Sequence, residues 1–257
     1  MSLMVLPVKA RKEEDRFDLF DTILHSIEES KITVENGDIL VISSKYVANS
    51  QGRLVNLQNI TVSKKASSLA KKFHMEPKIA EIILRESDVI FGGVAGFVIT
   101  SADNILAPNA GIDKSNVKKG KVVLYPNEPY LIAEQLRRKF FLKFLIHIGV
   151  IIIDSRLMPS RVGTTGIAIA CAGIEPVADR RAEKDLDGNT LKVTFQAVAD
   201  NLASIANHKM GEGSESQPFA IIKNSGAKLT DRKISKNEMA VSHDHCVYIR
   251  GLRKSKM

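Results

Sequence analysis

Apolar residues follow two patterns along this chain, and each pattern predicts a different kind of element. In some segments they recur every three or four positions, which places them on one face of a helix. Short apolar runs bounded by polar or turn residues predict strands instead. The predicted helices cover residues 16–29, 66–73, 77–83, 129–148 and 197–210, and the predicted strands cover residues 4–8, 38–43, 94–100, 105–107, 121–125, 150–153, 167–172, 191–195, 219–222 and 246–249.

Turn residues separate several of these elements. Asn36-Gly37 and Asp187-Gly188 are dipeptides typical of turns. The segment Ala102-Asp103-Asn104 separates two of the predicted strands, and we expect it to close a hairpin between them.

The most informative stretch begins at Gly149. Val150 to Ile153 are four consecutive β-branched residues, a run that suits a strand buried on both faces. The run stops at Asp154-Ser155, where a carboxylate and a hydroxyl are well placed to bind a cation or a phosphate at the end of a strand. An ordinary core strand followed by a turn aspartate is an equally good interpretation. Small residues in the next apolar run leave room for close packing: Gly166, Ala168, Ala170 and Ala172.

Three other polar segments carry candidate chemistry. The hydroxyls of Ser43-Ser44 and the ammonium of Lys45 can hold a phosphate, although a polar turn explains this segment as well. The loop from Asn109 to Asn116 is dense in groups that bind metals or hydrogen-bond a base or sugar, and such residues are also common in plain surface loops. In the segment Met210 to Gln217, glycines flank Glu212 and permit close approach of the backbone to a ligand.

Acidic residues near the ends of predicted elements form the remaining constellation. Asp113, Asp154 with Ser155, and Glu212 all supply oxygen ligands. Mg²⁺ and Mn²⁺ prefer such ligands and share them with phosphate oxygens. The spacing alone therefore suggests, weakly, a divalent cation held on a nucleotide.

The segment His243-Asp244-His245-Cys246 presents two imidazoles. In a strand, His243 and His245 would share a face and could act as metal ligands. No second ligand pair at the spacing of a structural zinc site occurs in the sequence, which favours a polar strand near the end of the chain.

Composition narrows the class of protein. The 257 residues suffice for one large domain or two small ones, and 44% hydrophobic with 26% charged residues is an ordinary globular balance. No apolar run is long enough to span a bilayer and the N-terminus does not resemble a signal peptide, so we expect no membrane association. Two cysteines form no disulfide framework, which fits a reducing cytoplasm.

The formal net charge of +8 has two interpretations. A basic surface keeps a protein soluble, and it also attracts anions such as nucleotides or phosphorylated metabolites. We expect no nucleic-acid partner, because only 5% of residues are aromatic, tryptophan is absent and no nucleic-acid-binding motif occurs. The sequence also lacks a P-loop, a dinucleotide-binding glycine motif and the Gly-x-Ser-x-Gly motif of serine hydrolases.

Taken in order, these segments resemble the coenzyme F420-0:γ-glutamyl ligase family. No single motif is decisive, but the ordered set spans most of the chain and is specific. The resemblance rests on Gly37-Asp38-Ile39-Leu40-Val41, Gly52-Arg53, Asn109-Ala110-Gly111-Ile112-Asp113 with Ser115-Asn116, Gly149-Val150-Ile151-Ile152 with Asp154-Ser155, Gly166 with Ala168-Ile169 and Ala172-Gly173, Lys184-Asp185-Leu186 with Gly188, Val198-Ala199-Asp200 and Met210-Gly211-Glu212-Gly213.

The resemblance implies the fold and the assembly. It implies an α+β fold of two interleaved lobes with mixed and antiparallel sheets. Residues 1–257 would form one catalytic unit whose lobe boundaries the sequence does not fix. It also implies a homodimer.

The resemblance further implies a reaction and a site. L-glutamate would be joined to coenzyme F420-0 with GTP as co-substrate and two Mg²⁺ or Mn²⁺ ions per site, with a K⁺ requirement left open. Asp113 and Asp154 would bind one metal, and Ser155 and Glu212 the other. The resemblance and the local chemistry together assign the nucleotide site to Ser44, Lys45, Asn116, Met210, Gly211, Gly213, Ser214, Glu215, Ser216 and Gln217, and Arg161 is a candidate for holding an anionic substrate group.

Three departures from the family pattern keep alternatives open. The segment 9–17 lacks the family's Gly-Leu-Pro-x-Ile sequence, and Asn49 stands where a lysine is expected. After Asp154, where the family usually has Thr-x-Gly-Arg, this chain has Ser155-Arg156-Leu157-Met158. These changes affect nucleotide and acceptor contacts more than metal ligands. An amino-acid ligase that uses another nucleotide or carboxylate, and an inactive nucleotide-binding homologue, are the alternatives.

Overall fold

The computed structural model describes residues 2–13, 16–102 and 105–252. The chain forms two compact units, each built from two separate segments. The first unit contains Met1–Leu54 and Tyr125–Ser235, and the second contains Val55–Leu124 and Lys236–Met257. The units therefore interleave along the sequence.

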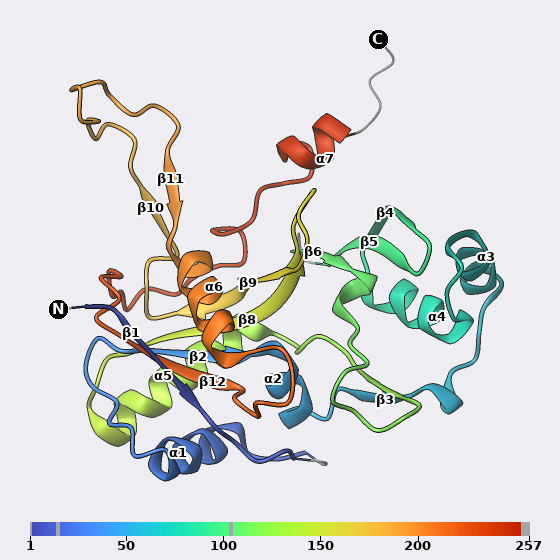
Figure 1. Ribbon diagram of the computed structural model, residues 1–257, viewed down its shortest axis with the longest axis horizontal. Coiled ribbons are helices and arrows are strands. Elements are labelled where there is room, and N and C mark those ends of the chain that lie inside the picture. Colours follow the sequence, from blue (N-terminus) through green and yellow to red (C-terminus); the bar gives the residue numbers. More distant parts are fainter. Residues whose placement is uncertain (1, 14–15, 103–104, 253–257) are drawn as a thin grey trace. The chain divides into compact units, whose positions relative to one another are not determined.

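A mixed sheet of five strands forms the centre of the first unit (Figure 1). Its strands, from one edge to the other, are β1 (Met4–Val8), β12 (Phe219–Lys223), β2 (Ile39–Ser43), β8 (Gly149–Leu157) and β9 (Thr164–Ala172). Strands β2 and β8 are parallel, and every other neighbouring pair is antiparallel.

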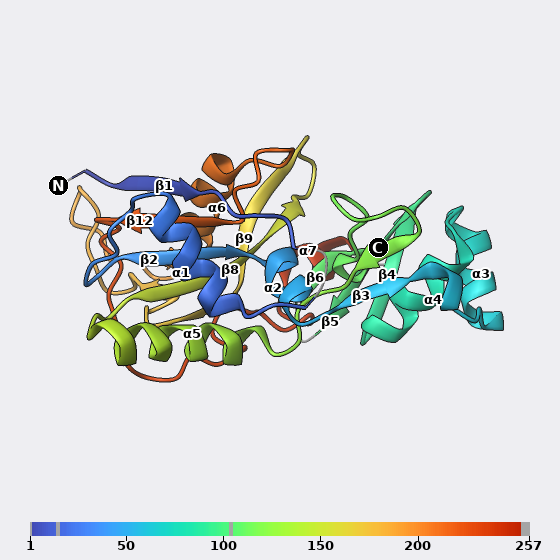
Figure 2. The same ribbon diagram turned by 90° about the horizontal axis from the view of Figure 1, so that it is seen from below.

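Helices cover both faces of this sheet. Helices α1 (Leu19–Glu29) and α5 (Pro129–Phe144) lie on one face, and α6 (Val198–Met210) lies on the other (Figure 2). Asp18 starts α1 by accepting a hydrogen bond from the backbone N–H of Asp21 at 2.9 Å. The rings of Phe20 and Phe140 meet edge to face, with centroids 5.3 Å apart, and join α1 to α5.

The strand predicted at residues 150–153 is present and fully buried, and it continues further than the sequence suggested. Val150, Ile151 and Ile152 are 0% exposed. Asp154 and Ser155 lie inside β8, because pairing with β9 persists as far as Leu157 opposite Thr164. The parallel pairing with β2 does end there, at Ser43 opposite Ile153. Asp154 is thus the first residue of β8 beyond the end of its neighbour.

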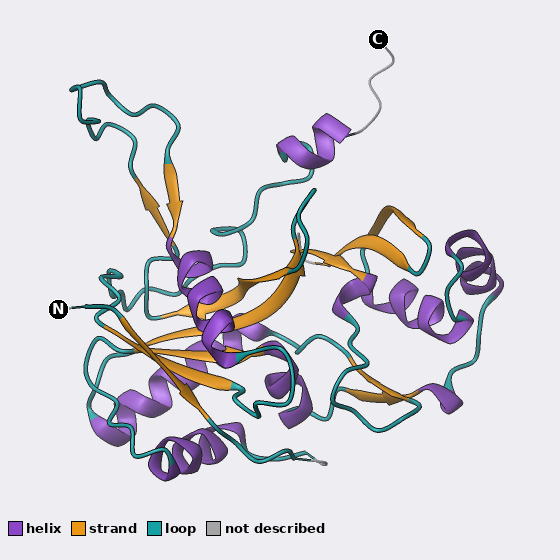
Figure 3. Ribbon diagram, viewed as in Figure 1, coloured by secondary structure: helices purple, strands orange, loops and turns teal. Residues whose placement is uncertain are grey.

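Two smaller elements of the first unit correct the sequence prediction. The segment that begins at Ser44 is a short helix, α2 (Ser44–Ser50), and not a polar turn. The strand predicted at residues 191–195 is wrong: β11 (Phe195–Ala197) begins where that prediction ends and pairs with β10 (Val177–Asp179). Val193 is 83% exposed, so no buried face fixes a strand register there. Figure 3 shows the long loop that joins β10 to β11.

The second unit combines an antiparallel sheet with two helices. Strands β4 (Val89–Val94), β5 (Phe97–Ala102) and β6 (Ile105–Pro108) form one sheet, and β3 (Leu54–Asn56) pairs with β7 (Lys121–Val123). Helices α3 (Lys64–Phe73) and α4 (Pro77–Glu86) pack on a core that includes Ile82 and Val98. Single helical turns occur at Leu57–Asn59 and Asn109–Gly111.

Two predictions for this unit need correction. The strand predicted at residues 94–100 spans the turn between β4 and β5, where Gly96 has a φ of 80°. Residues 246–249 are not a strand but belong largely to helix α7 (Val247–Leu252), and Val247 is 75% exposed, so no buried strand face exists. The predicted hairpin strands β5 and β6 do pair, while Asp103 and Asn104 of its turn lie outside the described residues.

The α+β fold with mixed and antiparallel sheets is confirmed. Among the residues that the structure describes, no helix is both long and apolar enough to cross a membrane.

Close packing of α6 on β9 gives a first testable prediction. A Cβ atom at Gly166 would lie 2.5 Å from Asn207 Cβ and 2.6 Å from the carbonyl oxygen of Ala203. Gly166→Ala should therefore push α6 away from β9 and destabilise the protein by about 1–3 kcal/mol. Urea denaturation measures this loss.

The matched control is Gly251→Ala, because a Cβ atom there would meet no other atom within 4 Å. We expect that variant to be as stable as the original or slightly more stable, since alanine favours helix. Equal stability of both variants would contradict the described packing of α6.

Candidate functional site

The ends of the two parallel strands bring a hydroxyl and a carboxylate together. Ser44, which directly follows β2 and is 4% exposed, donates a hydrogen bond from Oγ to Asp154 Oδ1 at 3.1 Å. Carboxyl ends of neighbouring parallel strands are where α/β proteins place ligands. Two residues 110 positions apart in the sequence therefore belong to one site.

A buried arginine and a tyrosine bind the other oxygen of Asp154. Arg156, whose side chain is 5% exposed, donates from Nε to Asp154 Oδ2 at 2.8 Å. The Tyr125 hydroxyl donates to the same oxygen. Nη2 of Arg156 contacts that hydroxyl in turn, and the guanidinium carbon lies 5.3 Å from the centre of the Tyr125 ring. Both oxygens of Asp154 therefore have fixed partners.

Tyr125 remains a hydrogen-bond donor under ordinary conditions. Desolvation raises the pKa of the Tyr125 hydroxyl well above its usual value, and the nearby Asp154 carboxylate raises it further. Arg156 acts in the opposite direction but is outweighed.

Ser155 takes part in a second group of polar contacts. Its Oγ lies 2.7 Å from Glu212 Oε1 and 3.3 Å from Asn207 Oδ1. The same Glu212 oxygen accepts hydrogen bonds from Asn207 Nδ2 at 2.8 Å and from Thr164 Oγ1 at 3.1 Å. The predicted neighbourhood of Ser155 and Glu212 is thus present, and two further residues hold the carboxylate in place.

Polar contacts along α6 fix the helix on β9 and so determine where Glu212 lies. The carboxylate of Asp200 accepts a hydrogen bond from the backbone N–H of Ala168 at 2.9 Å, and Ser204 Oγ donates to the carbonyl of Gly166 at 2.8 Å. Burial raises the pKa of Asp200 above its usual value. Asp200, Ser204 and Asn207 are three or four positions apart, so they lie on one side of α6.

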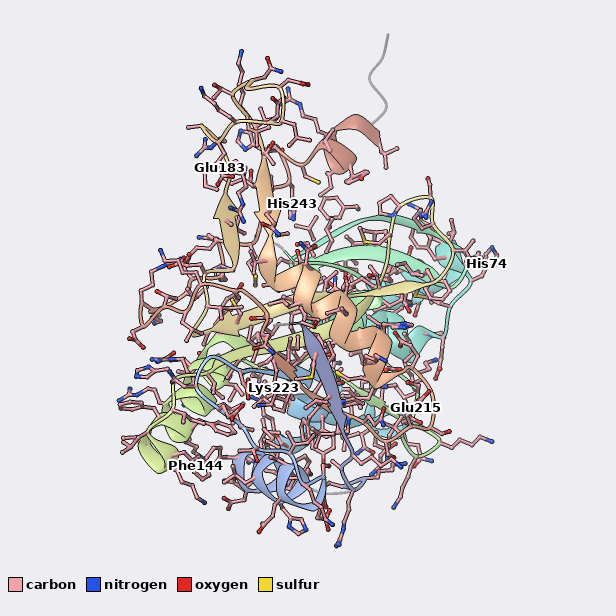
Figure 4. The ribbon with its side chains drawn as sticks, turned by 60° about the vertical axis from the view of Figure 1, so that its left-hand side comes forward. His74, Phe144, Glu183, Glu215, Lys223 and His243 are labelled. Atoms are coloured by element: carbon pink, nitrogen blue, oxygen red, sulfur yellow. The ribbon has the colours of Figure 1, made fainter. Side chains whose placement is uncertain are left out.

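The loop after α6 contains most of the predicted nucleotide-binding residues. Met210 is the buried last residue of the helix, and Gly211 follows with a φ of 79°. Gly213 donates its backbone N–H to Glu215 Oε2 at 2.8 Å, and a Cβ atom at Gly211 would lie 2.5 Å from the Glu215 carboxyl carbon. Glycine at position 211 therefore lets the loop fold over this carboxylate, which Figure 4 labels beyond the end of α6.

The remaining residues of the first unit that were predicted to bind the nucleotide or an anionic group lie close in the sequence to the segments described above. Lys45 is half-buried in α2, beside Ser44. Ser214 and Ser216 are exposed in the loop after α6, and Gln217 is half-buried. Arg161 is exposed in the turn that joins β8 to β9.

Asp113 and Asn116 belong to the second unit. The carboxylate of Asp113 accepts hydrogen bonds from the Ser115 backbone N–H at 2.7 Å and from Ser115 Oγ at 3.0 Å. The backbone of Asp113 pairs with Val123. Asn116 is exposed and has a φ of 56°. The predicted sharing of a metal by Asp113 and Asp154 stays a prediction.

The two imidazoles near the C-terminal end of the second unit have separate partners. His243 Nε2 lies 3.0 Å from Ser101 Oγ, and its ring meets Phe91 edge to face. His245 Nδ1 lies 2.7 Å from Ser242 Oγ in a turn, so the shared strand face predicted for His243 and His245 is wrong. Within the described part of the chain, no three or more His, Cys, Asp or Glu side chains are grouped to hold a metal ion.

The metal ligands predicted in the first unit would suit a hard divalent cation better than a soft one. Asp154, Ser155 and Glu212 offer only oxygen atoms, which Mg²⁺ and Mn²⁺ prefer.

Sequence reasoning missed four residues of this site: Tyr125, Arg156, Thr164 and Asn207. Arg156 could have been found from strand periodicity, because it lies two residues after Asp154 and so on the same side of β8. The strand predicted from the sequence ends at Ile153, so its periodicity does not reach Arg156. Nothing local in the sequence marks the contacts of Tyr125 or Asn207.

Comparison with known proteins identifies one family. The model of the F420-0:Gamma-glutamyl ligase family matches residues 8–224. The coenzyme F420:L-glutamate ligase of Methanopyrus kandleri is 36% identical over 224 residues, which cover 86% of this chain and 87% of the relative. The enzyme of that name from Methanocaldococcus jannaschii is 39% identical over 201 residues, covering 78% and 80%. That from Methanothermobacter thermautotrophicus is 34% identical over 207 residues, covering 80% and 82%.

Like charges beside Glu212 should destabilise the site in a pH-dependent way. Asn207→Asp replaces the amide nitrogen 2.8 Å from Glu212 Oε1 by an oxygen. In metal-free buffer the introduced carboxylate places a second negative charge beside Glu212, and like charges this close repel each other. The variant should therefore lose stability relative to the original protein as the pH rises, and recover it as the pH falls.

Urea denaturation at several pH values measures this effect, and Asn201→Asp is the matched control. Asn201 lies on the exposed side of the same helix. A pH-independent difference for Asn207→Asp, or the same dependence in the control, would rule out the described contact.

Proposed function

The chain belongs to the F420-0:gamma-glutamyl ligase family, and from this premise we propose that it joins L-glutamate to coenzyme F420-0 through an amide bond. We propose GTP as the co-substrate and Mg²⁺ or Mn²⁺ as the metal. The relatives named above carry the name of this ligase, which supports the reaction for this chain.

The proposed chemistry has two steps. An oxygen of the acceptor carboxylate attacks the γ-phosphorus of GTP, GDP leaves, and an acyl phosphate forms. The amine of L-glutamate then attacks the acyl carbon, inorganic phosphate leaves, and the nitrogen loses a proton. Phosphoryl transfer depends on positioning and charge neutralisation more than on a protein nucleophile.

The residues of the first unit suit these requirements. A divalent cation, when bound, supplies charge neutralisation on the phosphate oxygens. Asp154 would help to hold one such ion and Ser155 with Glu212 another, and the loop from Met210 to Gln217 would hold the nucleotide. The observations that carry the proposal are the contact of Ser44 with Asp154 at the ends of β2 and β8 and the contact of Glu212 with Ser155, the next residue of β8.

Other features remain predictions. Two metal ions per site and a homodimer are expected from the family resemblance, a cytoplasmic location is expected from the cysteine usage, and a K⁺ requirement is left open. The net charge of +8 is consistent with anionic substrates.

One observation favours a second candidate, a ligase of the same fold with a different nucleotide or acceptor. Asn49 stands where the family resemblance leads us to expect a lysine. Its side-chain oxygen Oδ1 is buried and, among the described residues, has no hydrogen-bond partner. A buried acceptor without a partner is costly and is often satisfied by a ligand or water. Asn49 would accept a hydrogen bond where a lysine can only donate one.

Phosphate release by the purified protein distinguishes these candidates. The assay contains Mn²⁺, L-glutamate and coenzyme F420-0, with GTP and ATP in separate reactions. Glutamate-dependent release with GTP supports the first candidate, and faster release with ATP supports the second. No release with either nucleotide, despite metal-dependent nucleotide binding, would exclude this acceptor.

Removal of predicted metal ligands should abolish the turnover. Glu212→Ala and Asp113→Ala should each lower it by at least about 100-fold, because even an outer partner of a metal ligand is worth roughly 10- to 100-fold. Glu183→Ala is the control, since Glu183 lies in the loop between β10 and β11 and pairs there with Arg180. Unchanged turnover in either ligand variant would refute the assignment of that residue.

A further inference from the structure

We infer that Arg156 is a positioning residue that makes the site prefer small octahedral cations over Ca²⁺, because it leaves Asp154 only one oxygen to offer. The inference rests on the proposed metal site. It goes beyond that site by assigning metal selectivity to a residue that binds neither metal nor substrate.

The contacts of Asp154 divide unequally between its two oxygens. Oδ2 accepts one hydrogen bond from Arg156 Nε at 2.8 Å and another from the Tyr125 hydroxyl. Among the residues that the structure describes, Oδ1 accepts one hydrogen bond, from Ser44 Oγ at 3.1 Å. A carboxylate oxygen has two lone pairs. Oδ2 is therefore fully occupied, and Oδ1 keeps a lone pair for a cation.

One available oxygen restricts which cation Asp154 can bind well. Ca²⁺ accepts six to eight oxygen ligands at variable angles and often takes both oxygens of one carboxylate. Mg²⁺ requires near-ideal octahedral geometry and typically takes one oxygen from each carboxylate. A carboxylate limited to Oδ1 therefore favours Mg²⁺ and Mn²⁺ and disfavours Ca²⁺.

Arg156 occupies its position at a cost, which argues for a specific role. Arg156 as a whole is 4% exposed, and its Nη1 atom is buried with no hydrogen-bond partner among the described residues. An unpaired buried donor is unfavourable, so general packing does not explain the placement. The contacts of Nε and Nη2 with Asp154 and Tyr125 do explain it.

Metal affinities of the full-length protein test the inference. The free Mn²⁺ signal in electron paramagnetic resonance gives the Mn²⁺ dissociation constant, and competition gives that of Ca²⁺. Both cations carry the same charge, so loss of the guanidinium charge shifts both affinities together and cancels in their ratio. The ratio therefore reports on the oxygen that Arg156 occupies.

Arg156→Met should lower the preference for Mn²⁺ over Ca²⁺ by roughly threefold to tenfold, near the low end of effects seen for outer partners of metal ligands. Tyr125→Phe removes the second donor to Oδ2 without changing any charge, and should give a smaller change in the same direction. The tyrosine variant also keeps the inference testable if Arg156→Met does not fold.

Two controls separate the possible outcomes. Arg137→Met removes another mostly buried, ion-paired arginine of the first unit, whose side chain is 13% exposed, and should leave the ratio unchanged. Asp154→Asn should weaken binding of both cations. Weaker binding of both cations by Asp154→Asn would confirm the metal site. The role of Arg156 would then be refuted if Arg156→Met and Tyr125→Phe kept the original ratio. It would also be refuted if Arg137→Met changed the ratio as much as Arg156→Met does. Unaltered Mn²⁺ binding in Asp154→Asn would refute the metal site itself.

Discussion

The parallel pairing of β2 with β8 is the constraint on which the candidate site depends. Its register places Ser43 opposite Ile153, so the next residue of each strand, Ser44 and Asp154, reaches the same end of the sheet. The ion pair of Asp154 with the buried Arg156 then fixes the carboxylate, and removal of either partner would leave the other charge uncompensated.

The positions of Asn207 and Glu212 depend on how closely α6 approaches β9. The absence of a side chain at Gly166 lets the helix pack directly on the strand, where Asp200 and Ser204 bind its backbone. This contact determines where α6 ends, and hence where Asn207 and Glu212 meet Ser155. The close packing at Gly166 thus places the Glu212 carboxylate at the hydroxyl of Ser155, the residue that follows Asp154.

The sequence predicts the buried strands well, because long apolar runs such as Val150 to Ile153 leave few alternatives. It does not predict elements without a buried face, and the prediction for residues 246–249 is wrong for that reason. The candidate acids were found as single residues, because carboxylates near element ends stand out. The partners that hold them were missed, since the contact of Tyr125 with Asp154 depends on a register between distant segments.

Anomalous scattering from crystals grown with Mn²⁺ and GDP is the most direct test of the central claim, that a divalent cation binds at the ends of β2 and β8. We expect a manganese peak at about 2 Å from Asp154 Oδ1, the distance typical of octahedral sites. Manganese bound at His243 or His245, with none at Asp154, Ser155 or Glu212, would contradict the claim.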